Sequence, residues 1–119
     1  MKDNKVFLRH ILDEVDYLIK ESKGLRLEEL MKNETLKRAF LRSLEVVGEA
    51  TKNISMDYRE KYPQVKWREL AGLRDKLIHQ YFGVNWSRVW DVIKNWIPEI
   101  KGEIEMILKE REGNDINRF

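Results

Sequence analysis

The stretch LKRAFLRSLEVVGEATKNI, residues 36–54, carries apolar side chains at intervals of three and four residues. An α-helix has about 3.6 residues per turn, so this spacing places them on one helix face. The face comprises Leu36, Phe40, Leu44, Val47, Ala50 and Ile54. Asn33 is a suitable N-cap, and Tyr62 followed by Pro63 is the next strong break, so the pattern predicts one long helix between them. Gly48 within this helix predicts the close approach of a second helix.

Two shorter features precede this helix. Apolar residues between Phe7 and Ile19 have the same helical spacing, and Gly24 follows them as a stop signal. The residues from Leu27 to Met31 are expected to form a short helical turn. The first half of the chain should therefore contain two long helices connected through this turn.

The second half is expected to contain two more helices. One covers residues 67–82, and Gly83 after it supplies the left-handed conformation that commonly ends a helix. The other begins after Asn85 and continues the apolar spacing to the end of the domain. Pro98 lies within it and predicts a kink, because proline has no backbone N–H to donate. Residues 113–119 are expected to fray.

Length and composition favour a single helical domain. A chain of 119 residues can bury about two-thirds of its unfolded surface in one core. We therefore expect one domain over residues 1–119, an all-α antiparallel up-and-down bundle of four main helices plus a short helical turn. The absence of cysteine excludes disulfides and thiolate-bound metal and suits a reducing cytoplasm. No apolar run is long enough to cross a membrane, so no membrane contact is expected.

The charge balance limits the ways in which the protein can bind nucleic acid. Lysine and arginine total 23 against 21 aspartate and glutamate, which gives a net charge of +2. Bulk charge therefore does not favour nucleic-acid binding, and any RNA contact must be local. The last predicted helix carries Trp86, Trp90 and Trp96. Such tryptophans most often belong to the core or to a subunit interface, and stacking against nucleic-acid bases is the less favoured alternative.

The densest group of reactive side chains is in LRDKLIHQYFG, residues 73–83. If this segment is helical, Asp75 and His79 are four residues apart and share a face, while Arg74 and Tyr81 are seven apart and align along another. A carboxylate one turn before a histidine favours the imidazolium, as does a helix C-terminus, so we expect His79 to titrate near or above neutrality. Such a histidine suits proton transfer, and the planar guanidinium of Arg74 suits phosphate binding. These groups are together suited to phosphodiester cleavage without a metal.

The same cluster has a plainer interpretation. Arg74, His79 and Tyr81 near a helix end can form a capping cluster, with Asp75 and His79 as a surface ion pair. The other histidine, His10, is interpreted as a solvated residue at the edge of the first helix. The sequence contains no glycine-rich phosphate loop, paired-histidine metal signature or serine–histidine–aspartate set, so neither metal nor cofactor is expected.

The run WRELAGLRDKLIHQYFGVNWSRVWDVI, residues 67–93, resembles the HepT-like branch of the HEPN superfamily. The signature of that branch is an arginine, four residues, a histidine, one residue and a tyrosine, which here are Arg74, His79 and Tyr81. The likeness extends to ILDEVDYLIKESKGL near the start of the chain and to LEVVGEATKNIS in the second long helix. The resemblance covers nearly the whole chain and implies a HEPN-like helical bundle.

This resemblance implies the toxin of a prokaryotic toxin–antitoxin pair, similar to type VII systems and located in the cytoplasm. The implied activity is that of a metal-independent endoribonuclease, a homodimer in which Arg74 and His79 of both copies face one cleft and Asp75 supports them. The implied partners are an RNA substrate and a nucleotidyltransferase antitoxin, which silences the enzyme by transferring AMP from ATP to Tyr81.

A dimer is also reasonable on chemical grounds. RNA cleavage by the ribose 2′-hydroxyl requires one group that accepts a proton and one that donates a proton, and each copy has one suitable histidine, His79. Two alternatives stay open. One is a non-catalytic helical module that binds and regulates a nucleotidyltransferase. The other is a helical dimer whose motif is only a capping cluster and whose interface is formed by the tryptophans of the last helix.

Overall fold

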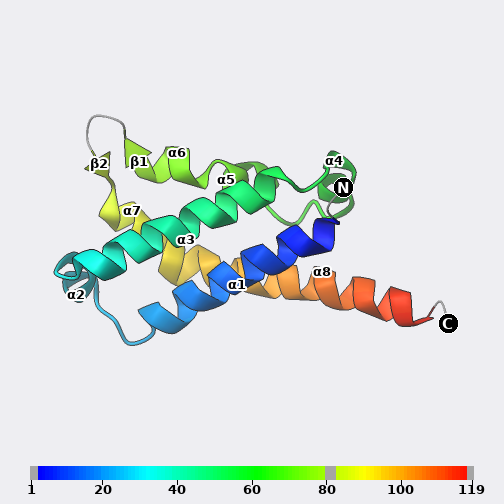
Figure 1. Cartoon of the computed structure of the whole chain (residues 1–119), viewed down its shortest axis with the longest axis horizontal. Helices are drawn as coiled ribbons and strands as arrows, with labels where there is room; N and C mark the ends of the chain where they lie inside the picture. The colour runs from blue at the N-terminus through cyan, green and yellow to red at the C-terminus, as the bar shows by residue number, and fades with distance from the viewer. Residues whose placement is uncertain (1–2, 80–82, 118–119) are drawn as a thin grey trace.

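The computed structural model describes residues 3–79 and 83–117, with the backbone alone for His79 and for residues 111–117. In this part of the chain the elements are, in order, α1 (Asn4–Ser22), α2 (Leu27–Met31), α3 (Glu34–Lys52), α4 (Met56–Lys61), α5 (Trp67–Ala71), α6 (Leu73–Leu77), β1 (Ile78–His79), β2 (Gly83–Val84), α7 (Trp86–Asp91), the π-helix η1 (Val92–Trp96) and α8 (Ile97–Asn117). Figure 1 shows α1 running opposite to both α3 and α8, with α5 and α6 lying along α3. The all-α class predicted from the sequence is confirmed.

The core lies between α1, α3, α5 and the α7–η1–α8 segment. Its fully buried side chains include Leu8, Ile11, Val15, Leu18, Phe40, Val47, Leu70, Ile97, Ile100 and Ile104. Burial of each such side chain stabilises the fold by about 1.5–3 kcal/mol relative to exposure. The apolar spacing read from the sequence therefore identifies the core correctly. Within the described residues, no helix is both long and apolar enough to span a bilayer.

The start of α3 matches the prediction. The side-chain oxygen of Asn33 accepts a hydrogen bond from the backbone N–H of Leu36 at 3.0 Å, as an N-cap does. Gly48 faces the end of α5, and a Cβ atom built on it would lie 3.3 Å from the carbonyl oxygen of Ala71. The predicted close approach of a second helix at this glycine is confirmed.

The end of α3 differs from the prediction. The expected single helix up to the Tyr-Pro break is wrong, because α3 ends at Lys52 and a second helix, α4, follows. The hydroxyl of Ser55 accepts a hydrogen bond from the backbone N–H of Tyr58 at 3.4 Å and caps the start of α4. The guanidinium of Arg59 donates to the carbonyl of Thr51 at 2.8 Å, which satisfies one of the free carbonyls at the end of α3.

The predicted helix over residues 67–82 is also wrong. It is interrupted at Gly72 and ends at Leu77, so it forms the two short helices α5 and α6. The backbone of Ile78 is extended, with φ −117° and ψ 117°, as β-branched residues favour. The N–H of Asn85 donates to the carbonyl of Leu77 at 3.0 Å and closes the connection between α6 and α7.

A short antiparallel pair of strands replaces the expected last turn of this helix. Ile78 pairs with Val84 and His79 pairs with Gly83. Gly83 has φ +75°, so the predicted left-handed glycine is confirmed, although it stands in a strand pair and not at a helix end. His79 is therefore held on extended backbone beyond the end of α6.

The last helical segment starts where it was predicted. The side-chain oxygen of Asn85 accepts from the N–H of Arg88 at 3.2 Å and caps α7. At its other end the backbone is helical as far as Asn117, so the expected fraying from residue 113 is not found up to that point. Residues 118–119 lie outside the described part of the chain.

The sequence predicts a kink at Pro98, and the structure has the π-helix η1 shortly before this residue. The N–H of Ile97 donates to the carbonyl of Val92, five residues earlier, where an α-helix would use the fourth. Pro98 follows directly and cannot donate a backbone hydrogen bond to the preceding turn. A wider turn before a proline relieves the crowding of its ring against that turn, and it changes which side chains face outward.

Candidate functional site

The helix α6 carries the arginine and aspartate predicted from the sequence. Leu73 and Leu77, four residues apart, are buried in the core, so the residues between them face outward. These are Arg74, Asp75 and Lys76, all of them exposed. The buried leucines thus fix the helix while three charged side chains reach solvent from it.

The guanidinium of Arg74 lies next to a carboxylate of α3. Its Nε is 3.7 Å from Oε1 of Glu45, and Oε2 of Glu45 is 3.6 Å from a terminal nitrogen of Arg42. A separation of 3.7 Å is an ion pair and too long for a hydrogen bond. The Arg74 side chain is 61% exposed, so the pair contributes at most about 1 kcal/mol and a phosphate from outside can compete for the guanidinium. Glu45 therefore orients Arg74 without occupying it fully.

The predicted helical relationship between Asp75 and His79 is wrong. It required the helix to continue through His79, whereas α6 ends at Leu77 and the backbone of His79 pairs with Gly83. The four-residue spacing therefore does not place the two residues on one helix face. The value expected for the pKa of His79 stays a prediction. Arg74 and His79 are instead carried by two different elements on either side of the junction between α6 and β1.

The remaining predicted residues have simpler outcomes. Tyr81 lies outside the described residues, and its proposed alignment with Arg74 required a helix that has already ended at Leu77. His10 is exposed and its ring meets Phe7 edge-on, with 6.3 Å between ring centroids, so its interpretation as a solvated residue is confirmed. In the described part of the chain, histidine and acidic side chains form no group of three that could hold a metal ion.

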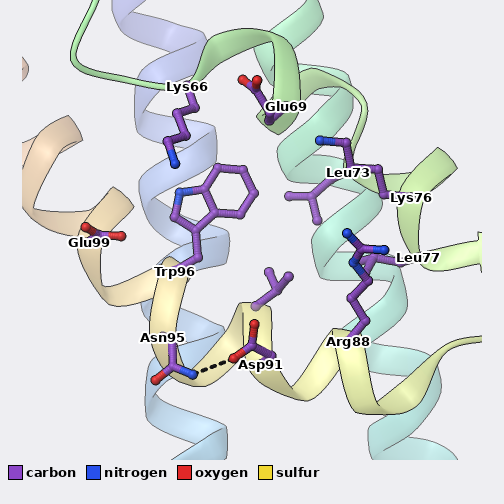
Figure 2. A pocket seen from close by; sticks show the side chains of 11 residues that line it. Lys66, Glu69, Leu73, Lys76, Leu77, Arg88, Asp91, Asn95, Trp96 and Glu99 are labelled. Atoms are coloured by element: carbon purple, nitrogen blue, oxygen red, sulfur yellow. Dashed lines mark hydrogen bonds between the residues drawn. The ribbon is translucent and has the colours of Figure 1, made fainter.

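A pocket of about 360 Å³ lies on the other side of α6, facing the α7–η1–α8 segment (Figure 2). Its walls carry charged, amide, apolar and aromatic side chains. They are Lys66, Glu69, Leu73, Lys76, Leu77, Arg88, Asp91, Val92, Asn95, Trp96 and Glu99. Figure 2 shows Trp96 on one side of the pocket and Leu73 and Leu77 on the other. Neither Arg74 nor Asp75 lines it.

Sequence reasoning missed this pocket, although a signal for it exists. The lining residues from the last helical segment are Arg88, Asp91, Val92, Asn95, Trp96 and Glu99. They recur at intervals of three and four, which indicates a second helix face beside the apolar one. The apolar face of this segment packs in the core, whereas the polar face lines a pocket only because α6 lies opposite it.

The family comparison matches the chain over most of its length. Residues 11–107 match the model of the family described as "Ribonuclease HepT-like". The chain belongs to this family. The matched range includes α6, β1 and the whole arginine–histidine–tyrosine signature. The family predicted from the sequence is therefore confirmed.

Curated relatives agree with this assignment along nearly the whole chain. A Methanocaldococcus jannaschii protein named "Putative RNase MJ1216" is 52% identical over 116 residues, covering 98% of this chain and 96% of that protein. "Putative RNase TTE0752" of Caldanaerobacter subterraneus subsp. tengcongensis is 46% identical over 94% of this chain and 100% of its own length. "Probable ribonuclease HepT" of Thermococcus cleftensis is 35% identical over 91% of this chain and 98% of its own length. No solved structure gives a significant match.

Proposed function

We propose that this protein is a metal-independent endoribonuclease that acts as the toxin of a toxin–antitoxin pair. Its membership of a ribonuclease family supports RNA as the substrate. The single observation that carries the proposal is Arg74, a largely exposed guanidinium on α6, the helix that directly precedes the strand bearing His79. An exposed, permanently charged fork suits the phosphate of an RNA strand.

The proposed reaction proceeds through a 2′,3′-cyclic phosphate. The ribose 2′-hydroxyl loses its proton to the imidazole of one His79 and attacks the adjacent phosphorus. The bond from phosphorus to the 5′-oxygen breaks, and the leaving oxygen receives a proton from a second imidazole. Arg74 stabilises the negative charge that develops on the phosphate oxygens.

A second copy of the chain would supply the second imidazole. His10 is on α1, where it is exposed and its ring meets Phe7 edge-on. A two-fold axis near the α6–β1 junction would place one His79 on each side of a shared phosphate. We propose this homodimer, with Asp75 as a supporting carboxylate, and a nucleotidyltransferase that silences it by adding AMP to Tyr81. The added group would bring bulk and negative charge to the phosphate-binding cleft.

The proposal is tested with the purified full chain and single-stranded RNA in excess EDTA. We expect cleavage that leaves 2′,3′-cyclic phosphate and 5′-hydroxyl ends. Arg74→Ala and His79→Ala should keep the helical circular dichroism spectrum and melting temperature of the wild type and lose at least about a hundredfold in rate. Undiminished cleavage by both folded variants, or activity that EDTA abolishes, would overturn the mechanism.

The matched control for these variants is Lys109→Ala. Lys109 is an exposed cation on α8, outside both the signature and the pocket beside α6. Removal of its charge should leave the cleavage rate within about twofold of the wild type, since single surface charges away from the bound strand contribute little. A comparable loss in this variant would mean that net charge, and not the position of Arg74, governs the reaction.

A further inference from the structure

The pocket between α6 and the α7–η1–α8 segment has the size and the mixed lining of a site for a small ligand. Its volume of about 360 Å³ lies at the lower end of the roughly 300–1,000 Å³ typical of such sites. Leu73 and Leu77 give it an apolar wall, and Val92 adds to the apolar surface. A flat apolar group fits against such a wall, whereas the charged rim requires polar atoms at the edge of that group.

Lys76 and Arg88 are two cations at this pocket that have no ion-pair partner among the described residues. Lys76 comes from α6 and Arg88 from α7, and both are exposed. Among the described residues, no carboxylate lies within ion-pair distance of either, whereas Arg74 has Glu45 beside it. Figure 2 shows Arg88 extending from α7 toward α6, on the side from which Lys76 also reaches the pocket. Two unpaired cations from different elements form a suitable place for an anionic group from outside.

One aromatic wall and several acceptors complete the pocket. Trp96 is half-buried, and it is directed into the pocket from the last turn of η1 (Figure 2). Asp91 accepts a hydrogen bond from the amide of Asn95 at 2.6 Å, so its position at the rim is fixed. Glu99 adds a second carboxylate. Indole faces stack with nucleobases, and carboxylates accept hydrogen bonds from their exocyclic amines.

We propose that this pocket binds one unpaired nucleotide of single-stranded RNA. The base stacks on Trp96 and faces the leucine wall, its edge meets the carboxylates of the rim, and its phosphate lies between Lys76 and Arg88. The three cationic and three anionic side chains of the lining balance, which suits a singly charged nucleotide better than a free polyphosphate. The inference rests on the proposed ribonuclease function and adds the site at which the substrate is held.

The position of the pocket relative to Arg74 supports this assignment. Arg74 and Lys76 are two residues apart on α6, so they project from nearly opposite sides of the helix. An α-helix is about 10 Å across with its side chains, which an extended strand crosses in a few nucleotides. A strand passing over α6 can therefore place one phosphate at Arg74 and a nucleotide a few positions further along in the pocket.

The test follows the indole N–H signals of the full-length protein by NMR during titration with a single-stranded 2′-O-methyl RNA octamer. The methyl group blocks the attacking hydroxyl, so binding is observed without cleavage. We expect the signal of Trp96, assigned with Trp96→Phe, to shift, and that of Trp67 to stay in place. The Trp67 indole donates to the carbonyl of Tyr62 at 2.9 Å inside the core and serves as an internal control.

Two variants and one further ligand make the test specific. Lys76→Ala and Arg88→Ala should each weaken octamer binding about fivefold or more, whereas Lys109→Ala should bind as the wild type does. Inorganic polyphosphate of equal charge should leave the Trp96 signal unmoved, since it has no base to stack. An unmoved Trp96 signal at saturating octamer, or undiminished binding by both pocket variants, would overturn the proposal. A shift of the Trp96 signal caused by polyphosphate would overturn the proposal that the pocket recognises a base.

The two proposals can fail separately. RNA cleavage in EDTA together with an unmoved Trp96 signal would remove the nucleotide pocket and leave the ribonuclease. A Trp96 shift that saturates with the octamer, in a protein that cuts no RNA, would remove the ribonuclease and leave a single-strand binding site.

Discussion

The two sides of α6 differ in what surrounds their cations. On one side, Arg74 lies beside Glu45, which is itself next to Arg42. On the other side, Lys76 and Arg88 border the pocket. Among the described residues, no carboxylate lies at ion-pair distance from either of these two cations. A cation with a fixed carboxylate neighbour is held in one direction, while unpaired cations remain available to an external anion. The helix α6 thus carries an oriented arginine suited to phosphate chemistry and, two residues later, a lysine suited to binding an RNA strand.

The largest expected effect is that of Arg74→Lys on the cleavage rate. Arg74 lies on the side of α6 next to Glu45. Lysine keeps the charge and loses the planar fork that contacts two phosphate oxygens at once. We expect the cleavage rate at saturating RNA to fall about a hundredfold, with the fold and melting temperature unchanged. Single-turnover kinetics with a defined RNA measure this. A variant that cleaves as fast as the wild type would show that Arg74 acts only as a point charge, and the contrast with Lys76 would disappear.

The next effect concerns how α6 is held in place. In Gly48→Ala the new Cβ would lie 3.3 Å from the carbonyl oxygen of Ala71, which directly precedes the Gly72 break and α6. That oxygen is backbone and cannot move alone, so we expect a loss of about 1–3 kcal/mol in the free energy of unfolding. Urea denaturation measures it. The control is Gly102→Ala, because nothing lies within 4 Å of a Cβ built at Gly102 on α8. Equal stability of the Gly48 variant and the wild type would show that α5 can shift away freely.

The segment around this glycine shows how far the sequence predicts the structure. Asn33 predicts the start of α3 correctly because a cap acts within one turn of chain. Gly48 correctly predicts close packing, since an unexplained glycine within a helix has few other uses. The apolar spacing of α1 and α3 extends over several turns, and such long patterns identify a buried face well.

The candidate site is predicted less completely. Residues 67–78 keep an apolar spacing compatible with a helix, and that spacing continues past the actual end of α6 at Leu77. The extended state of Ile78 and His79 depends on pairing with Gly83 and Val84, which periodicity within one segment does not reveal. The helical geometry expected for Asp75 and His79 was therefore wrong, while the roles assigned to Arg74, Asp75, His79 and Tyr81 stay predictions. The pocket depends on two segments facing each other, and neither segment alone indicates it.

A smaller effect is expected for Glu45→Gln. The carboxylate competes with phosphate for Arg74 and repels a nearby RNA strand, and the exposed ion pair contributes at most about 1 kcal/mol. We expect the KM for RNA to fall about two- to fivefold in the variant. Glu49→Gln removes the same charge one turn later, where the carboxylate is 3.9 Å from Lys52 and away from Arg74, and serves as control. A rise in KM would mean that Glu45 mainly positions Arg74 and that its competition with RNA is negligible.

The smallest expected effect is that of Glu103→Gln on the melting temperature. Glu103 lies on α8, one turn beyond Glu99 of the pocket. Burial raises the pKa of Glu103 above its ordinary value of 4.5, the charge of Glu99 adds to the rise, and Lys66 opposes it. Because the folded protein holds this proton more tightly than the unfolded chain does, stability is lost as the pH rises from about 4.5 through the folded pKa. Glu103→Gln should therefore melt at a higher temperature than the wild type at pH 7, and the advantage should vanish at pH 3, where both states of the wild type are protonated. Melting curves at the two pH values measure this, with Glu110→Gln on the same helix as control. An equal advantage at both pH values would assign the gain to the amide itself and not to removal of a charge.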